Sequence, residues 1–85
     1  MPTISVFYGI RIRLFNKEHN PPHFHASYQG HRATYDFEGN RTEGEMPKKQ
    51  DALIRAWALL HSDDLQVGWE MAQEGEVPHN IDPLR

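Results

Sequence analysis

The residues best suited to chemistry lie in one short stretch near the start of the chain. It combines three imidazoles, a carboxylate and two adjacent prolines in the order Glu18-His19-Asn20-Pro21-Pro22-His23-Phe24-His25-Ala26. Alternate side chains of a strand point to the same face, so His23 and His25 share one face and the apolar residues beside them share the other. The prolines favour extended backbone and form a stiff connector between His19 and this strand. The spacing predicts a polar face that carries a site.

A divalent-metal site is the first chemistry that these residues suggest. Imidazole and carboxylate groups bind zinc, iron(II), nickel and manganese, and two histidines with one carboxylate leave coordination positions for a substrate. The two principal ligands would be His23 and His25. The candidates to complete the set are His19, Glu18, Asp36 and Glu38. No other cofactor is expected, and the alternative is that the histidines only tie the proline loop to the sheet by hydrogen bonds.

Metal-free RNA cleavage is a second chemistry for the same stretch. One histidine would take the proton of a 2′-hydroxyl group, another would protonate the leaving oxygen, and an arginine would stabilise the phosphorane. The catalytic candidates are His19, His23, His25, Arg11 and Arg13.

Composition limits the classes of partner. Nine Lys and Arg against twelve Asp and Glu give a net charge of −3, which argues against a general polyanion binder. Nucleic acid is expected only at a local basic patch, which requires that Arg11, Arg13, Lys17 and Arg32 gather on one face. Cysteine is absent, and neither a signal peptide nor a membrane span is evident, so we expect a cytoplasmic protein without membrane contact.

The elements that must position the histidines begin with β-branched and aromatic residues. Two strands, 4–8 and 10–15, are expected around Gly9. The clearest hairpin pairs 23–29 with 31–38 around Gly30, and its loop is either Gln29-Gly30 or Gly30-His31. Both loops give the same faces, which are an apolar face of Phe24, Ala26, Tyr28, Ala33, Tyr35 and Phe37, and a polar face of His23, His25, Ser27, Thr34, Asp36 and Glu38. If Gly30 opens the loop, His25 lies opposite Asp36 and His23 opposite Glu38.

The second half of the chain predicts a weak edge strand, 41–46, and then two helices at about 47–61 and 63–74. The first helix would bury a stripe of four residues, Leu53, Ala56, Trp57 and Leu60. The second would start at Ser62 as N-cap and bury Leu65, Trp69 and Ala72. An extended tail, 76–85, would be pinned by Ile81 and Leu84.

The fold class that follows is α+β. We expect an antiparallel sheet of four to five strands, over about 3–46, followed by two C-terminal helices packed on one face. Residues 1–85 would form a single domain with a thin core, since a chain this short buries only about 60% of its unfolded surface. The expected core includes Phe24, Tyr35, Phe37, Trp57 and Trp69.

Several of these residues together resemble a family of small bacterial proteins classed as domain of unknown function 4160. The resemblance is carried by the stretch 18–26, Met46-Pro47, Trp57, His61, Leu65, Trp69 and the closing Ile81-Asp82-Pro83-Leu84. The segment 41–45 departs from the family pattern, which is more apolar there. Such proteins are often encoded beside a second small protein, so the resemblance implies a candidate toxin–antitoxin-like module, and it implies no catalytic residues.

The first functional hypothesis is therefore a small interaction or regulatory protein, such as one half of a toxin–antitoxin-like pair, with a protein partner or self-association. A thin core and a poorly protected edge strand would suit such a role. The alternatives are a metal-binding protein or enzyme and a metal-free ribonuclease, both built on His19, His23 and His25.

Overall fold

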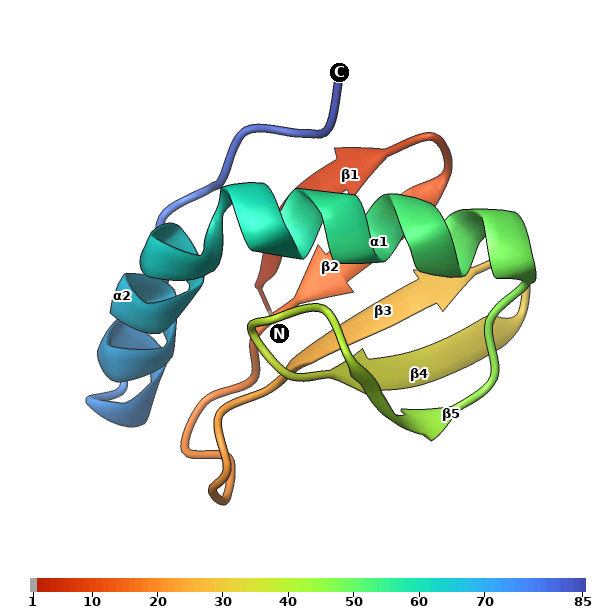
Figure 1. Cartoon of the computed structure of the whole chain (residues 1–85). Helices are drawn as coiled ribbons and strands as arrows, with labels where there is room; N and C mark the ends of the chain where they lie inside the picture. The colour runs from red at the N-terminus through yellow and green to blue at the C-terminus, as the bar shows by residue number, and fades with distance from the viewer. Residues whose placement is uncertain (1) are drawn as a thin grey trace.

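The computed structural model describes residues 2–85 and contains an antiparallel sheet of five strands followed by two helices (Figure 1). The predicted α+β fold class is confirmed. The strands lie side by side in chain order, so each connection is a hairpin or a loop between neighbours. The elements are β1 (Thr3–Phe7), β2 (Ile10–Arg13), β3 (Phe24–Tyr28), β4 (His31–Tyr35), β5 (Arg41–Gly44), α1 (Lys48–Leu60) and α2 (Ser62–Gln73).

The two tight hairpins use the same kind of turn. Tyr8-Gly9 joins β1 to β2 and Gln29-Gly30 joins β3 to β4, and all four residues have positive φ, between 44° and 86°. Two positive φ values in a two-residue loop define the type I′ turn, whose twist matches that of the strands. The β3–β4 loop is therefore Gln29-Gly30.

This loop corrects the predicted facing of histidines and carboxylates. Phe24 pairs with Tyr35 and His25 pairs with Thr34, so His25 does not lie opposite Asp36, nor His23 opposite Glu38. That facing depended on a loop opened by Gly30, and it does not occur because Gln29 opens the loop in the left-handed conformation. The assignment of faces is unaffected, since the two registers differ by an even number of residues.

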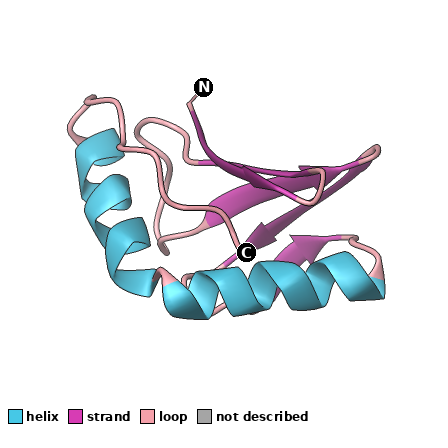
Figure 2. Cartoon of the chain, turned by 90° about the horizontal axis from the view of Figure 1, so that it is seen from above, coloured by secondary structure: helices cyan, strands magenta, loops and turns pink. Residues whose placement is uncertain are grey.

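The core lies between one face of the sheet and α1 (Figure 2). Phe24 is its centre, because its ring stacks on Tyr35 at 5.4 Å and meets the edge of Trp57 at 5.6 Å. From α1 the buried residues are Ile54, Trp57 and Ala58, while Leu60 is 70% exposed. The predicted stripe was wrong in Leu60 and in Ala56, which is also exposed. The helix carries apolar residues around much of its circumference. Helical spacing alone therefore fits both the predicted stripe and the buried one, and Trp57 belongs to both.

The second helix packs at the end of the sheet rather than over its centre (Figures 1 and 2). It buries Leu65, Trp69 and Ala72, as predicted. A β-carbon on Gly68 would lie 2.9 Å from Leu14 Cδ1, so the glycine permits close packing of α2 on the chain after β2. Ser62 is not the N-cap, because His61 precedes the helix and no side chain caps it.

The C-terminal residues run without helix or strand along β1. The Ile81 amide donates to the Ile4 carbonyl at 2.7 Å, and Trp57 Nε1 donates to the Asp82 carbonyl at 2.8 Å. The tail thus protects one sheet edge, while every residue of β5, at the other edge, is exposed. Among the described residues, no helix is long and apolar enough to cross a bilayer.

The pairing of β4 with β5 can be tested with two glycines of equal conformation. Gly44 and Gly30 have φ of 85° and 86°, but a β-carbon at Gly44 would lie 2.2 Å from the Arg32 carbonyl oxygen, whereas that at Gly30 meets nothing within 4 Å. Gly30→Ala should cost about 1 kcal/mol from strain alone, and Gly44→Ala about 3 kcal/mol or more. Thermal unfolding measures both, and equal losses would contradict the β4–β5 register.

Candidate metal centre

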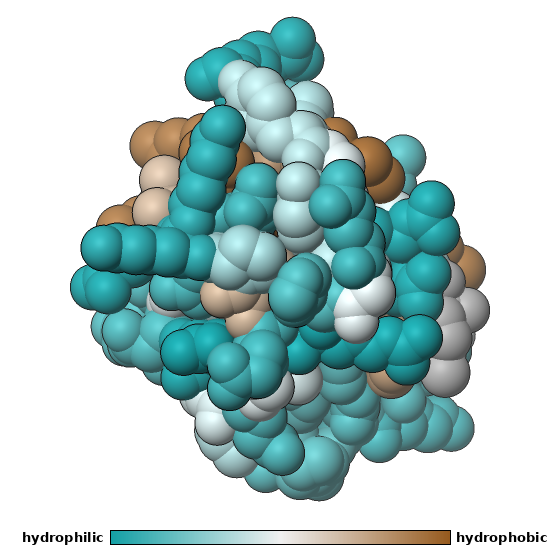
Figure 3. Space-filling model, turned by 90° about the vertical axis from the view of Figure 1, so that its right-hand side faces the viewer, coloured by the Kyte–Doolittle hydropathy of each residue, from teal (hydrophilic) through white to brown (hydrophobic). Residues whose placement is uncertain are grey.

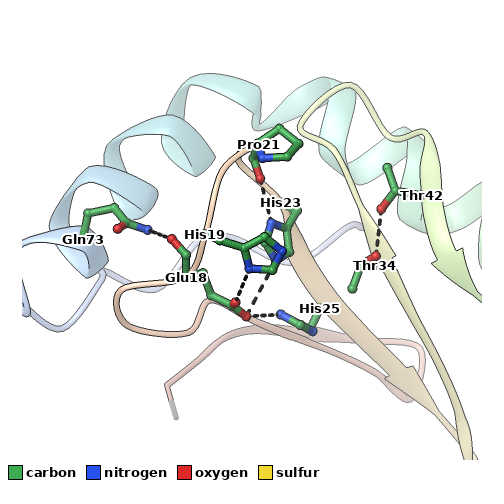
Figure 4. Close-up of polar contacts among 8 residues, drawn as sticks. All are labelled: Glu18, His19, Pro21, His23, His25, Thr34, Thr42 and Gln73. Carbon is green, nitrogen blue, oxygen red and sulfur yellow. Dashed lines mark hydrogen bonds and ion pairs between the residues drawn. The ribbon is translucent and has the colours of Figure 1, made fainter.

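The carboxylate of Glu18 lies at the centre of the predicted histidine stretch. Glu18 belongs to the loop between β2 and β3, His23 directly precedes β3, and His25 is its second residue. Glu18 Oε1 lies 2.7 Å from His25 Nε2 and 3.6 Å from His23 Nε2, and Oε2 lies 3.6 Å from His19 Nδ1 (Figure 4). The loop folds back so that Glu18 meets the strand that follows it.

The three side chains nearest one another are shielded from solvent. The exposed fraction is 17% for Glu18, 12% for His23 and 28% for His25, whereas that of His19 is 83%. One ligand atom from each of Glu18, His23 and His25 lies within 4.8 Å of the other two, and the described residues contain one such group. We call these three residues the ligand triad.

Hydrogen bonds determine which nitrogen of each ring carries a proton. His23 Nδ1 lies 2.8 Å from the Pro21 carbonyl oxygen, which can only accept, so Nδ1 is the donor. In a neutral ring this places the lone pair on Nε2, the atom that points toward Glu18. His25 Nε2 donates to Glu18 Oε1 when the glutamate is ionised. The triad therefore presents a lone pair, a carboxylate and one exchangeable proton.

Aromatic side chains hold both rings. Phe15 stacks on His25 with a centroid distance of 4.1 Å and an interplanar angle of 11°, and Trp69 of α2 lies 5.5 Å from His23. The loop backbone is bonded to α2, because Gln73 Nε2 donates to the Glu18 carbonyl at 2.9 Å and the Lys17 amide donates to the Ala72 carbonyl at 3.3 Å. These contacts hold the side chains of the triad in their positions.

The pKa of the Glu18 carboxyl lies below its usual value. Burial raises the pKa, but the hydrogen bond from His25 and the charges of His25, His23 and His19 together outweigh it. The carboxylate is thus ionised at neutral pH and ready to bind a cation.

The other predicted site residues lie outside the triad. Asp36 closes the turn after β4, where its Oδ1 accepts from the amides of Glu38 and Asn40 at 2.9 Å. Neither Asp36 nor Glu38 joins the group of ligands. Arg13 pairs with His25 across β2 and β3, and Arg11 pairs with Ser27 one step along the same face.

A hollow of about 230 Å³ opens beside His23. It is lined by His19, Pro21, Pro22, His23, Thr34, Asp36, Thr42 and Glu43. Asp36 therefore borders this space without reaching the triad. The sequence did not identify Phe15, Trp69 or Gln73 as parts of the site. Only Phe15, close in the chain, could have been suspected from its position.

These features define a small α+β domain with a histidine–carboxylate cluster on a sheet whose other face is covered by α1. The family comparison agrees with the predicted resemblance. Residues 9–70 match the model of a domain of unknown function, DUF4160, and the chain belongs to that family. Neither a curated protein nor a solved structure shows a significant match.

The lowered pKa of Glu18 gives a pH dependence of defined sign. A carboxyl whose pKa is lower in the folded state contributes stability that is present above its unfolded pKa and is lost as pH falls through the folded value. Carboxyl NMR should therefore show a Glu18 midpoint below 4.5. The difference in unfolding free energy between wild type and Glu18→Gln should shrink as pH falls below this value. The exposed Glu76→Gln serves as the control, and a Glu18 midpoint above 4.5 would contradict the arrangement.

Proposed function

We propose that the chain binds a divalent first-row transition metal through Glu18, His23 and His25. One observation carries the proposal, which is that three ligand atoms of suitable type lie within 4.8 Å of one another on side chains whose orientations are already fixed. Zinc, iron(II), nickel and manganese all accept imidazole and carboxylate ligands.

The distances suit a metal ion after small movements. Ligand atoms about 2.0–2.1 Å from an ion lie about 3 Å from one another. Glu18 Oε1 lies 2.7 Å from His25 Nε2 and 3.6 Å from His23 Nε2, so these distances fall on either side of that value. A metal would replace the proton on His25 Nε2 and would meet the lone pair of His23 Nε2.

The surroundings of the triad also resemble those of metal ligands. A histidine that binds metal through one nitrogen usually donates a hydrogen bond from the other, which fixes its tautomer. His23 Nδ1 and the Pro21 carbonyl form such a bond. A histidine that serves only to tie the loop to the sheet would not need its second nitrogen to face a carboxylate.

Two histidines and one carboxylate leave coordination positions open. A water molecule bound there loses a proton more readily, which supplies a hydroxide for hydrolysis at neutral pH. The hollow beside His23 offers space for a substrate. We therefore propose a hydrolytic role for the metal site. The metal-free ribonuclease hypothesis uses the same residues, and it differs in predicting activity in the presence of a chelator.

An interaction protein is the second candidate function, and the exposed edge of β5 supports it. All four residues of this strand are exposed, and its outer backbone groups are available to another strand. A partner in a toxin–antitoxin-like pair would fit such an edge. A cytoplasmic location and this pairing both stay predictions.

Metal binding can be measured by titrating the metal-free protein with zinc or cobalt(II). We expect one ion per chain and a higher Tm at saturation, since a ligand at 100 times its Kd stabilises by about 2.7 kcal/mol. His23→Ala and His25→Ala should each lower the affinity by more than about 100-fold, because even outer-shell changes cost about 10–100-fold. Cobalt absorption bands report the ligands directly.

The control for this experiment is His79→Ala, which removes an exposed histidine of the tail. It should leave the affinity unchanged. Equal losses in His79→Ala and His23→Ala would show that zinc binds scattered surface histidines. A metal-free wild type whose Tm does not respond to metal, together with a lower Tm in His23→Ala, would assign the histidines to the fold alone.

Self-association through β5 predicts a mass that depends on concentration. Sedimentation should show dimers, and Thr42→Pro, in the exposed edge strand, should shift the equilibrium to monomer because proline disfavours strand pairing. Val67→Ser, on the exposed side of α2, is the control. A monomer at all concentrations would leave a different protein as the partner to test.

A further inference from the structure

The face of the sheet turned away from α1, here called the outer sheet face, gathers arginines. Ile12 and Ala26 are buried against each other, so their neighbours along the strands point outward. Two cross-strand rows result. The first row contains Arg11, Ser27 and Arg32, and the second contains Arg13, His25 and Thr34.

The first row borders a second hollow at the end of the sheet where the two tight hairpin turns lie. Arg11 and Arg32 lie on either side of Ser27, and together with His31 they line a space of about 290 Å³, the arginine hollow. This end of the molecule is largely hydrophilic (Figure 3). The hollow thus combines two permanent cations with a hydroxyl group and an imidazole, all of which can donate to an anion.

The arginines of these rows have no carboxylate partner within residues 2–85, although the chain has twelve acidic and nine basic residues. The one arginine–carboxylate pair in the described structure joins Arg41 to Asp51, in the β5 and α1 region. Arg13 Nε is buried and also has no hydrogen-bond partner in that part of the chain. Arg11 and Arg32 carry like charges on either side of Ser27 and repel each other. An anion bound between them would remove this repulsion.

Acidic groups border this face on two sides, because Glu18 contacts His25 of the second row and two glutamates lie at the β5 edge. Glu43 pairs with Thr34 across β4 and β5, and the Glu45 amide donates to the Arg32 carbonyl. Both glutamates are exposed, at the β5 edge. The positive charge therefore forms a stripe across β2 and β4 with an acidic border. This shape favours an elongated anion that follows the stripe, and it disfavours an anion that covers the whole face.

We propose that the arginine hollow binds a phosphate of a single-stranded nucleic acid, whose backbone continues past Arg13 to the triad at His25. This inference rests on the proposed function and names its substrate class. Successive outward residues of one strand lie about 7 Å apart, so Ser27 and His25 place the two rows at neighbouring points of one path. Arginine is suited to phosphate because its planar group donates two parallel hydrogen bonds.

The shape of the face favours a single strand over a duplex. The outer sheet face offers neither a helix nor a projecting ribbon to enter a groove. Sheets that bind single strands combine a charged path with aromatic groups on which bases stack. Phe15, half-buried and stacked on His25, lies beside the end of this path. A phosphodiester is also a substrate that metal-activated water hydrolyses.

Fluorescence anisotropy with labelled oligouridine tests the proposal. Binding is measured in EDTA over a range of KCl concentrations, so that the result does not depend on the metal. Wild type should bind with a salt-dependent affinity. Arg11→Gln with Arg32→Gln should weaken binding about tenfold and reduce the salt slope by about 0.7, since the two arginines hold one phosphate and each neutralised phosphate of a single strand contributes about 0.7.

Arg55→Gln is the matched control, because it removes an exposed arginine from α1, on the other layer of the molecule. It should bind as wild type does, and thermal unfolding confirms that each variant is folded. Arg11→Lys with Arg32→Lys should keep most of the salt slope.

Three outcomes would overturn the inference. They are an absence of RNA binding by the wild type, an equal loss in Arg55→Gln, and equal binding of a polyglutamate peptide, which would assign the stripe to an acidic protein partner. RNA binding is measured in EDTA, and metal binding is measured by titrating the metal-free protein without RNA, so each can fail while the other is observed. Failure of the metal site and failure of the nucleic-acid path are therefore separate results.

Discussion

The attachment of α2 to the loop after β2 is the constraint on which the site depends. The loop bears Glu18, and on its own it has no regular structure to fix it. Gln73 and the Ala72 carbonyl bind its backbone, and Gly68 allows the helix to approach Leu14 closely enough for these bonds to form. Backbone groups satisfied in this way hold the Glu18 side chain under the histidines. The helix that closes the core therefore also fixes the site.

The free-energy cost of burying the polar triad argues against a purely structural role for it. Three polar side chains are largely removed from water, in a domain whose small core leaves little stability to spare. A hydrogen bond between His25 and Glu18 compensates one pair of atoms. His23 Nε2 lies 3.6 Å from the same carboxylate, beyond hydrogen-bond distance, and a cation between the two would bind both. Apolar residues could join the loop to the sheet at a lower cost.

Sequence patterns predicted what depends on local geometry. Alternation placed His23 and His25 on one face, and type I′ turns at Tyr8-Gly9 and Gln29-Gly30 lie where hairpins were expected. Local pattern could not choose between Gln29 and Gly30 as the opening residue, and so it left the cross-strand partner of His25 undecided, which the structure gives as Thr34. Nor could it find the bond from Gln73 to Glu18, because 55 residues separate them and only packing brings them together. Helical periodicity likewise failed in α1, where the sheet decides which of two apolar stripes is buried.

The tautomer of His23 links the structural and the metal hypotheses. With Nδ1 donating to Pro21, the other nitrogen presents its lone pair to an ionised glutamate, and a cation between them satisfies both. A proton and a metal ion are the two cations that fit this position, and they compete because the ligands must be deprotonated to bind metal. A stable triad without metal and a metal centre are thus two states of one arrangement. The affinity for metal should consequently decrease as the pH is lowered, even though the fold is unchanged. Histidines that only tie the loop to the sheet would bind no metal and would show no such dependence.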